Sequence, residues 1–172
     1  MLPMDCDLAL AHPLMQRIVQ VESAGNPHAI GVVGTSLERQ PKEPEEAVAT
    51  ALSLRSAGLN FSIGLAQVNQ VHFKRLGWTA DLRKGFDRCA NVSAGAEIFN
   101  TCYARAIARG YPASAADGAY SATHAALSCY YSGDLVAGAR LGYVDKVLGA
   151  TASAPTKVAA RRLPQMMLFM SE

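Results

Sequence analysis

Glu22 is the residue whose type and position best suit acid–base chemistry. It is the only carboxylate between Asp7 and Glu38, and it lies on the same side of a predicted helix as Leu14 and Ile18. Burial disfavours the charged form of a carboxyl group, and a rise in pKa from about 4.3 to roughly 6–7 would make it a proton donor near neutral pH. Its position alone also fits a solvated Glu near a helix end.

A second group of polar residues follows a glycine within residues 62–69. Gly64 allows the backbone to come close to another part of the protein. Gln67 and Asn69 would face one side of an extended segment, and their amides suit N-acetyl groups and sugar hydroxyls. The alternative is a glycine turn followed by a helix that Asn69 caps.

A third group is a pair of adjacent tyrosines, Tyr130 and Tyr131, at the end of an alanine-rich segment. Their phenol groups could border a binding site, although most such tyrosines pack in a core.

Helices are the elements that must position these residues. Proline, acidic and glycine residues mark several helix ends, and Asn91 is the predicted N-cap of the longest helix. We expect a mostly helical domain over residues 1–149, with one small β-hairpin from segments 30–35 and 59–63, followed by a C-terminal tail over 150–172. The predicted helices span residues 13–23, 44–57, 70–76, 91–109, 114–130 and 142–148.

Composition narrows the function classes. Half of the 172 residues are apolar, 17% are charged, and the net charge of +2 is too small to indicate nucleic-acid binding. No apolar run is long enough for a membrane span. No signal peptide is visible, so an exported protein would have had its leader removed.

The four cysteines, at positions 6, 89, 102 and 129, and the four histidines show no metal-binding spacing. We therefore expect no metal. Scattered cysteines in even number fit two disulfides in an oxidising compartment, with three possible pairings. The alternative is four buried free thiols.

Together these motifs resemble the signature of lysozyme-like lytic transglycosylases, which cleave peptidoglycan. The resemblance covers about residues 5–148, and it implies a lysozyme-like fold with a hairpin beside the cleft, no cofactor and a periplasmic location. The insert between Glu22 and Gly64, together with Gly142-Tyr143-Val144, resembles the subgroup attached to type IV secretion and conjugation systems. The matching motifs are Glu22-Ser23, Gly64-Leu65-Ala66-Gln67-Val68-Asn69, Cys89 and Tyr130-x-Ser132-Gly133.

The resemblance assigns roles to single residues. Glu22 is the implied acid and base, and a disulfide between Cys6 and Cys89 leaves Cys102 to pair with Cys129. Two positions depart from the family pattern, with Ala66 in place of Met and Tyr131 in place of Asn. The implied glycan-binding residues are Ser23, Ser62, Gly64, Leu65, Gln67, Asn69, Tyr130 and Tyr143.

The reaction that the resemblance implies needs a single carboxyl group. Most glycosidases use two, and Asp134 is the only weak candidate for a second acid. In the family route the product carries a 1,6-anhydro sugar, and the partners are peptidoglycan strands and components of the secretion apparatus. The alternatives are a hydrolytic muramidase and a non-catalytic peptidoglycan-binding assembly factor.

Overall fold

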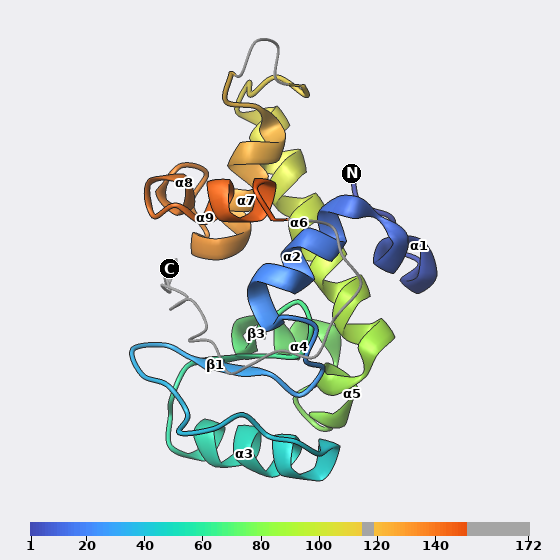
Figure 1. The fold of residues 1–172 in the computed structure, drawn as a ribbon, viewed down its shortest axis with the longest axis vertical. Coiled ribbons are helices and arrows are strands. Elements are labelled where there is room, and N and C mark those ends of the chain that lie inside the picture. The colour runs from blue at the N-terminus through green and yellow to red at the C-terminus, as the bar shows by residue number, and fades with distance from the viewer. Residues whose placement is uncertain (115–118, 151–172) are drawn as a thin grey trace.

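The computed structural model describes residues 1–114 and 119–150, and most of these residues are helical. The long helix α6 runs through the middle of the molecule, while the sheet and α3 lie together at one end of the view (Figure 1). The predicted class, mostly helical with a small antiparallel sheet, is confirmed. The elements are α1 (Cys6–Ala11), α2 (Pro13–Ser23), β1 (Ile30–Val32), α3 (Pro44–Ser56), β2 (Phe61–Ile63), β3 (Val68–Asn69), the 3-10 turn η1 (Gln70–His72), α4 (Phe73–Leu76), α5 (Arg83–Phe86), α6 (Arg88–Ala108), α7 (Ala122–Ser132), α8 (Ala137–Arg140) and α9 (Tyr143–Leu148).

Helix α6 is central because one of its faces carries buried apolar residues, among them Val92 and Phe99. It packs against α1, α5 and α7. Its N-cap is Asp87, whose carboxylate accepts a hydrogen bond from the N–H of Ala90 at 2.8 Å. The prediction that Asn91 caps this helix is therefore wrong, and the side chain of Asn91 serves the site described below.

The sheet has three antiparallel strands in the order β1-β2-β3, rather than the two of the expected hairpin. Ile30 pairs with Ile63 between β1 and β2, and Ser62 pairs with Asn69 between β2 and β3. Strand β3 has only two residues, which is too short for an alternating pattern to reveal it in the sequence.

Several helix ends also differ from the expectation. The helix predicted from residue 114 begins at Ala122, where Ser121 and His124 form a capping box. Helices α1, α5 and α8 were not predicted, because four to six residues give too few turns for a periodic apolar pattern. The helices expected from Pro13, Pro44 and Gly142 are present.

Two disulfides hold the helices together. Cys6–Cys89 joins α1 to α6, and Cys102–Cys129 joins α6 to α7. These are the pairs that the resemblance implied, and they replace the alternative of four free thiols. No helix among the described residues is long and apolar enough to cross a membrane. From residue 151 onward, the tail assigned to 150–172 lies outside the described residues.

Candidate active site

Glu22 lies in the last turn of α2, on the face that also buries Met15 and Ile18. The helix stops after Ser23 because Ala24 takes left-handed backbone angles, with φ of 54°. Only 1% of Glu22 is exposed. Burial penalises its charged form and raises the pKa of the carboxyl group from 4.5 to about 7. The predicted burial of Glu22 is confirmed.

Helix α9 supplies two groups that oppose the effect of burial. The hydroxyl of Tyr143 donates a hydrogen bond to Oε1 of Glu22 at 2.5 Å, and this bond lowers the carboxyl pKa. The positive charge of Lys146 lowers it further. Because Oε1 accepts from Tyr143, the proton of the neutral acid belongs on Oε2. Tyr143, expected only as an aromatic glycan contact, therefore touches the carboxyl group itself.

Helix α7 brings a second aromatic ring to the same place. Tyr131 stacks on Tyr143, with ring centroids 4.5 Å apart and planes 16° from parallel. Burial and the charge of Glu22 both raise the pKa of Tyr131. Helices α2, α7 and α9 thus meet at one carboxyl group, and Tyr131, one of the two residues that depart from the family pattern, lies within this cluster.

The loop between β2 and β3 closes around the side chain of Asn91, which is completely buried. Oδ1 of Asn91 accepts a hydrogen bond from the N–H of Ala66 at 2.7 Å. Its Nδ2 donates to the carbonyl oxygens of Ile63 at 2.8 Å and Gly85 at 2.7 Å. A Cβ on Gly64, where φ is 77°, would lie 2.2 Å from this Nδ2. The predicted close approach of backbone at Gly64 is confirmed, and the neighbour is Asn91.

Sequence analysis assigned the wrong role to Asn91. It occupies the first turn of α6, where an Asn is easily taken for a cap. The sequence did contain a signal, because Asp87, four residues earlier, is an equally good cap. With the helix starting there, Asn91 lies on the same face as the buried Gly95, four residues further on.

Gln67 points into the protein and does not follow an extended path. Its φ is 46°, a left-handed value, and 3% of it is exposed. Its Nε2 donates to the carbonyl oxygens of Ala29 at 3.0 Å and Gly64 at 2.9 Å. The expectation that Gln67 and Asn69 face one side of an extended segment is therefore wrong, because the turn at Gln67 interrupts it.

The other expected glycan-binding residues here are buried as well. Nδ2 of Asn69 donates to Oδ1 of Asn60 at 2.9 Å and to Oγ of Ser62 at 3.1 Å. Asn69 also caps η1, as the alternative reading of this segment proposed. Ser23 and Leu65 are 4% and 6% exposed. Ser23 bonds backbone groups at the end of its own helix, and the amide donors of Asn69 are engaged within the sheet region.

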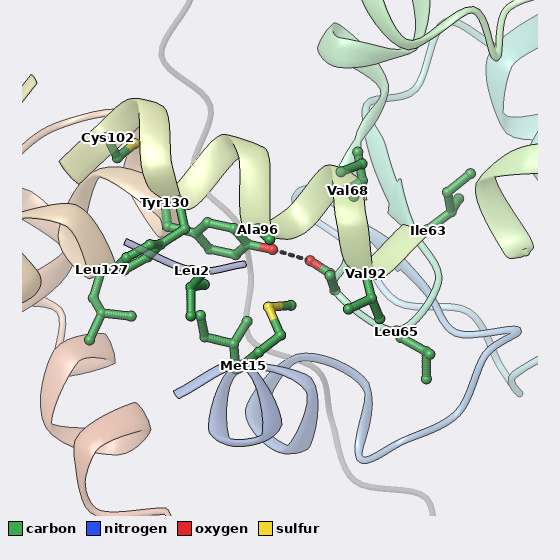
Figure 2. Close-up of a cluster of buried hydrophobic side chains, with 14 of the residues drawn as sticks. Leu2, Met15, Ile63, Leu65, Val68, Val92, Ala96, Cys102, Leu127 and Tyr130 are labelled. Atoms are coloured by element: carbon green, nitrogen blue, oxygen red, sulfur yellow. Dashed lines mark hydrogen bonds between the residues drawn. The ribbon is translucent and has the colours of Figure 1, made fainter. Parts of the chain in front are cut away.

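Tyr130 connects the loop to the carboxyl cluster. Its hydroxyl donates to the carbonyl oxygen of Ala66 at 2.6 Å, the dashed line in Figure 2. Burial and the charge of Glu22 raise its pKa well above 10, so it stays a donor. Ala66 is fully buried, and a Cβ on Gly95 of α6 would lie 2.6 Å from its own Cβ. Ala66 therefore sets how closely the loop approaches α6, and it does not line an open wall.

Asp134, the candidate for a second catalytic acid, has a structural role instead. Its carboxylate accepts hydrogen bonds from the N–H groups of Val136 and Ala137, both at 2.8 Å, and these bonds lower its pKa. Asp134 therefore caps a turn and is not suited to donate a proton. Among residues 1–114 and 119–150, no group of three or more His, Cys, Asp or Glu side chains could hold a metal ion.

The arrangement suits catalysis by one carboxyl group that acts first as an acid and then as a base. Such a group needs a pKa near the working pH, and burial gives Glu22 that value. The Tyr143 hydrogen bond orients the carboxyl, while Asn91 and Tyr130 fix the neighbouring loop from two sides.

Comparison with known proteins shows which sequences this chain is similar to. Residues 6–134 match the model of the transglycosylase SLT domain, whose fold is lysozyme-like. The type IV secretion system protein virB1 of Brucella suis biovar 1 and that of Brucella abortus are each 42% identical over 161 residues, which is 91% of this chain. Protein virB1 of Agrobacterium fabrum is 28% identical over 145 residues, or 83% of this chain. The chain spans 64% of the length of the Brucella proteins and 55% of the Agrobacterium protein. No solved structure is significantly similar to it.

Proposed function

This chain belongs to the transglycosylase SLT domain family, and from that membership we propose that it is a peptidoglycan lytic transglycosylase. It would cleave the β-1,4 bond between N-acetylmuramic acid and N-acetylglucosamine and leave a 1,6-anhydro end. The observation that carries the proposal is the buried carboxyl of Glu22, bound by Tyr143 and with a pKa near neutrality. The catalytic domain in this proposal is residues 1–149.

In the first half of the reaction, Glu22 acts as the acid. The proton on Oε2 passes to the glycosidic oxygen, the bond to C1 of the muramic acid breaks, and the N-acetylglucosamine leaves as an alcohol. The substrate's own N-acetyl oxygen stabilises the positive charge that develops at C1. No second protein carboxylate is needed, in keeping with the capping role of Asp134.

In the second half, the ionised Glu22 acts as the base. It takes the proton of the muramic acid C6 hydroxyl, whose oxygen forms the new bond to C1, so no water is consumed. Tyr143 donates to Oε1 throughout and stabilises the carboxylate between the two steps. One group performs both transfers because its pKa lies near the working pH.

The segment 62–69 contributes in this proposal by fixing the backbone beside Glu22. The side-chain donors of Gln67 and Asn69 are engaged within the protein. Ser62, Gly64 and Leu65 shape the same loop. Glycan contacts from this side would come from its backbone and from the adjoining helix ends, which include Ser23 and Tyr130.

The similarity to type IV secretion system proteins supports a proposal about the cell compartment and the apparatus in which this activity is used. We assign the chain to the periplasm, where peptidoglycan strands are its substrate and a secretion or conjugation apparatus uses the opening that it makes. Two disulfides fit an oxidising compartment of this kind.

Product mass is the decisive test of the reaction. Purified peptidoglycan treated with the wild type should release muropeptides with anhydro ends, 18 Da lighter than the products of hydrolysis. Glu22→Gln should lower release by about 10²–10⁴-fold, the range for loss of a general acid or base, while circular dichroism shows an intact fold. Hydrated ends would identify a muramidase. Binding without release by the wild type would identify an assembly factor.

A further inference from the structure

We propose that Tyr131 is a positioning residue, whose ring holds Tyr143 so that the Tyr143 hydroxyl donates to Oε1 of Glu22. The inference rests on the proposed function for its catalytic meaning, although its structural content can be measured without substrate. It concerns Tyr131, one of the two positions at which this chain departs from the family pattern.

The geometry of the two rings carries the proposal. Their centroids lie 4.5 Å apart and their planes are within 16° of parallel, so each ring covers one face of the other. The rings come from α7 and α9, which pack together. Tyr143 is 2% exposed, and the Tyr131 ring accounts for one of the surfaces that bury it.

Helix α9 has little of its own to fix the Tyr143 side chain. It has six residues, and its N-cap is Gly142, which offers no capping side chain. A helix this short depends on packing for its orientation. Tyr143 is its first residue, and α2, α7 and α8 all pack against this helix, so the orientation of the Tyr143 ring depends on those contacts, among which the Tyr131 ring covers one of its faces.

The charged and titratable groups around Glu22 set the sign of the expected effect. Lys146 and Tyr143 act on it from α9, while Tyr130 and Tyr131 face it from α7. The Tyr143 hydrogen bond favours the ionised carboxyl. If Tyr143 loses its position, the carboxyl therefore holds its proton to higher pH.

Substitutions at position 131 distinguish the contribution of the aromatic ring from that of side-chain volume. Tyr131→Leu keeps apolar volume beside Tyr143 and removes the aromatic face that stacks on it. Tyr131→Phe keeps the ring and serves as the matched control. Tyr131→Met takes the place of Leu if that variant does not fold, because it also supplies apolar volume without a ring.

The measurement is a carbon-13 NMR titration of the Glu22 carboxyl in the free protein, assigned by its absence in Glu22→Gln. Tyr143→Phe should raise the midpoint by about one unit, the size expected when a hydrogen bond to a charged group is lost. Tyr131→Leu should raise it in the same direction. Tyr131→Phe should leave it at the wild-type value.

A double variant gives the sharper test. In the Tyr143→Phe background, Tyr131→Leu should add no further rise, since the bond through which it acts is already gone. A wild-type midpoint in Tyr131→Leu, an equal rise in Tyr131→Phe, or a fully additive double variant would each overturn the proposal. The titration needs no substrate, whereas failure of the proposed function would appear as the absence of anhydro products from the wild type.

Discussion

Glu22 and the loop between β2 and β3 border the same candidate site, but their polar groups are satisfied to different degrees. Glu22 is buried with one short hydrogen bond, from Tyr143, and its desolvation keeps the pKa near 7. Around the loop, the Asn91 side chain of α6 makes three hydrogen bonds, and Gln67 within the loop makes two. On the acid side of the site, which is Glu22 with Tyr143, burial therefore destabilises the charged carboxylate. On the loop side, which is the β2–β3 loop with Asn91, hydrogen bonds make the backbone rigid.

This difference indicates that the motif residues have two separate roles, one chemical and one structural. A buried acid is reactive because the surrounding protein does not compensate its charge fully. A loop beside it has to keep its shape without help from that acid, and internal hydrogen bonds supply this. Variants on the two sides should therefore change stability in opposite directions, and the following experiments test that contrast.

The largest loss of stability should come from removing a disulfide, because both disulfides connect helices on which Glu22 and the loop depend. The Cys6–Cys89 bond closes a loop with a sequence separation of 83 and ends two residues before Asn91. Its loss should lower the free energy of unfolding by about 4–5 kcal/mol in the chain-entropy model. Urea unfolding of Cys6→Ala/Cys89→Ala measures this loss. Cys102→Ala/Cys129→Ala, with a separation of 27, should lose less, and an equal loss would speak against the entropic account.

On the loop side, Asn91→Ala should destabilise the protein by about 3–4 kcal/mol, because three buried backbone groups lose their partner. Urea unfolding measures the loss, and KM for peptidoglycan fragments should rise at temperatures where the variant is folded.

The matched control for Asn91 is Asn100→Ala on the same helix. Asn100 bonds the backbone N–H and carbonyl of Leu2, away from the loop. It should lose stability without a change in KM. An equal rise in KM for both variants would mean that Asn91 acts only through global stability.

On the acid side, Glu22→Gln should raise the free energy of unfolding, whereas Asn91→Ala lowers it. The carboxyl has a pKa of about 7 in the folded protein, against 4.5 for the ordinary group, so wild-type stability falls as pH rises between these values. The full cost, about 3 kcal/mol, is reached above pH 7 and is absent below pH 4.5. The variant should therefore gain stability over the wild type at pH 8 and not at pH 4. A constant difference across that range would contradict the burial argument.

The smallest effect should come from Tyr130→Phe, which removes the bond between the two sides. The carbonyl of Ala66 loses the donor at 2.6 Å, and a buried hydrogen bond of this kind contributes about 1 kcal/mol. Thermal unfolding measures the loss, and turnover should fall as the loop loosens. Tyr120→Phe is the control, because its hydroxyl donates to the carbonyl of Leu135, remote from the loop. A comparable loss of turnover in the control would remove Tyr130 from the site.

Much of this arrangement could be predicted from the sequence where one residue acts within its own helix. The burial of Glu22 follows from its spacing after Ile18, and the glycine at position 64 follows from the need for a close approach. The helix ends at Pro13, Pro44 and Gly142 follow from capping chemistry.

The rest depends on contacts between distant segments, which no local pattern contains. Asn91 reads as a cap until Asp87 takes that role and the loop arrives beside it. Gln67 reads as an outward amide until its left-handed backbone turns it inward. The stack of Tyr131 on Tyr143 joins residues that only the packing of α7 on α9 brings together.

The two disulfides share α6, and this has a mechanical consequence. Cys89 lies at the start of that helix and Cys102 thirteen residues further on, so a covalent path leads from α1 through α6 to α7. The helix that follows α1 carries Glu22, and α7 carries Tyr130 and Tyr131. Motions that pull α1 away from α7 are therefore opposed by covalent links, and α2, which follows α1 directly, is held close to the helix that carries the two tyrosines.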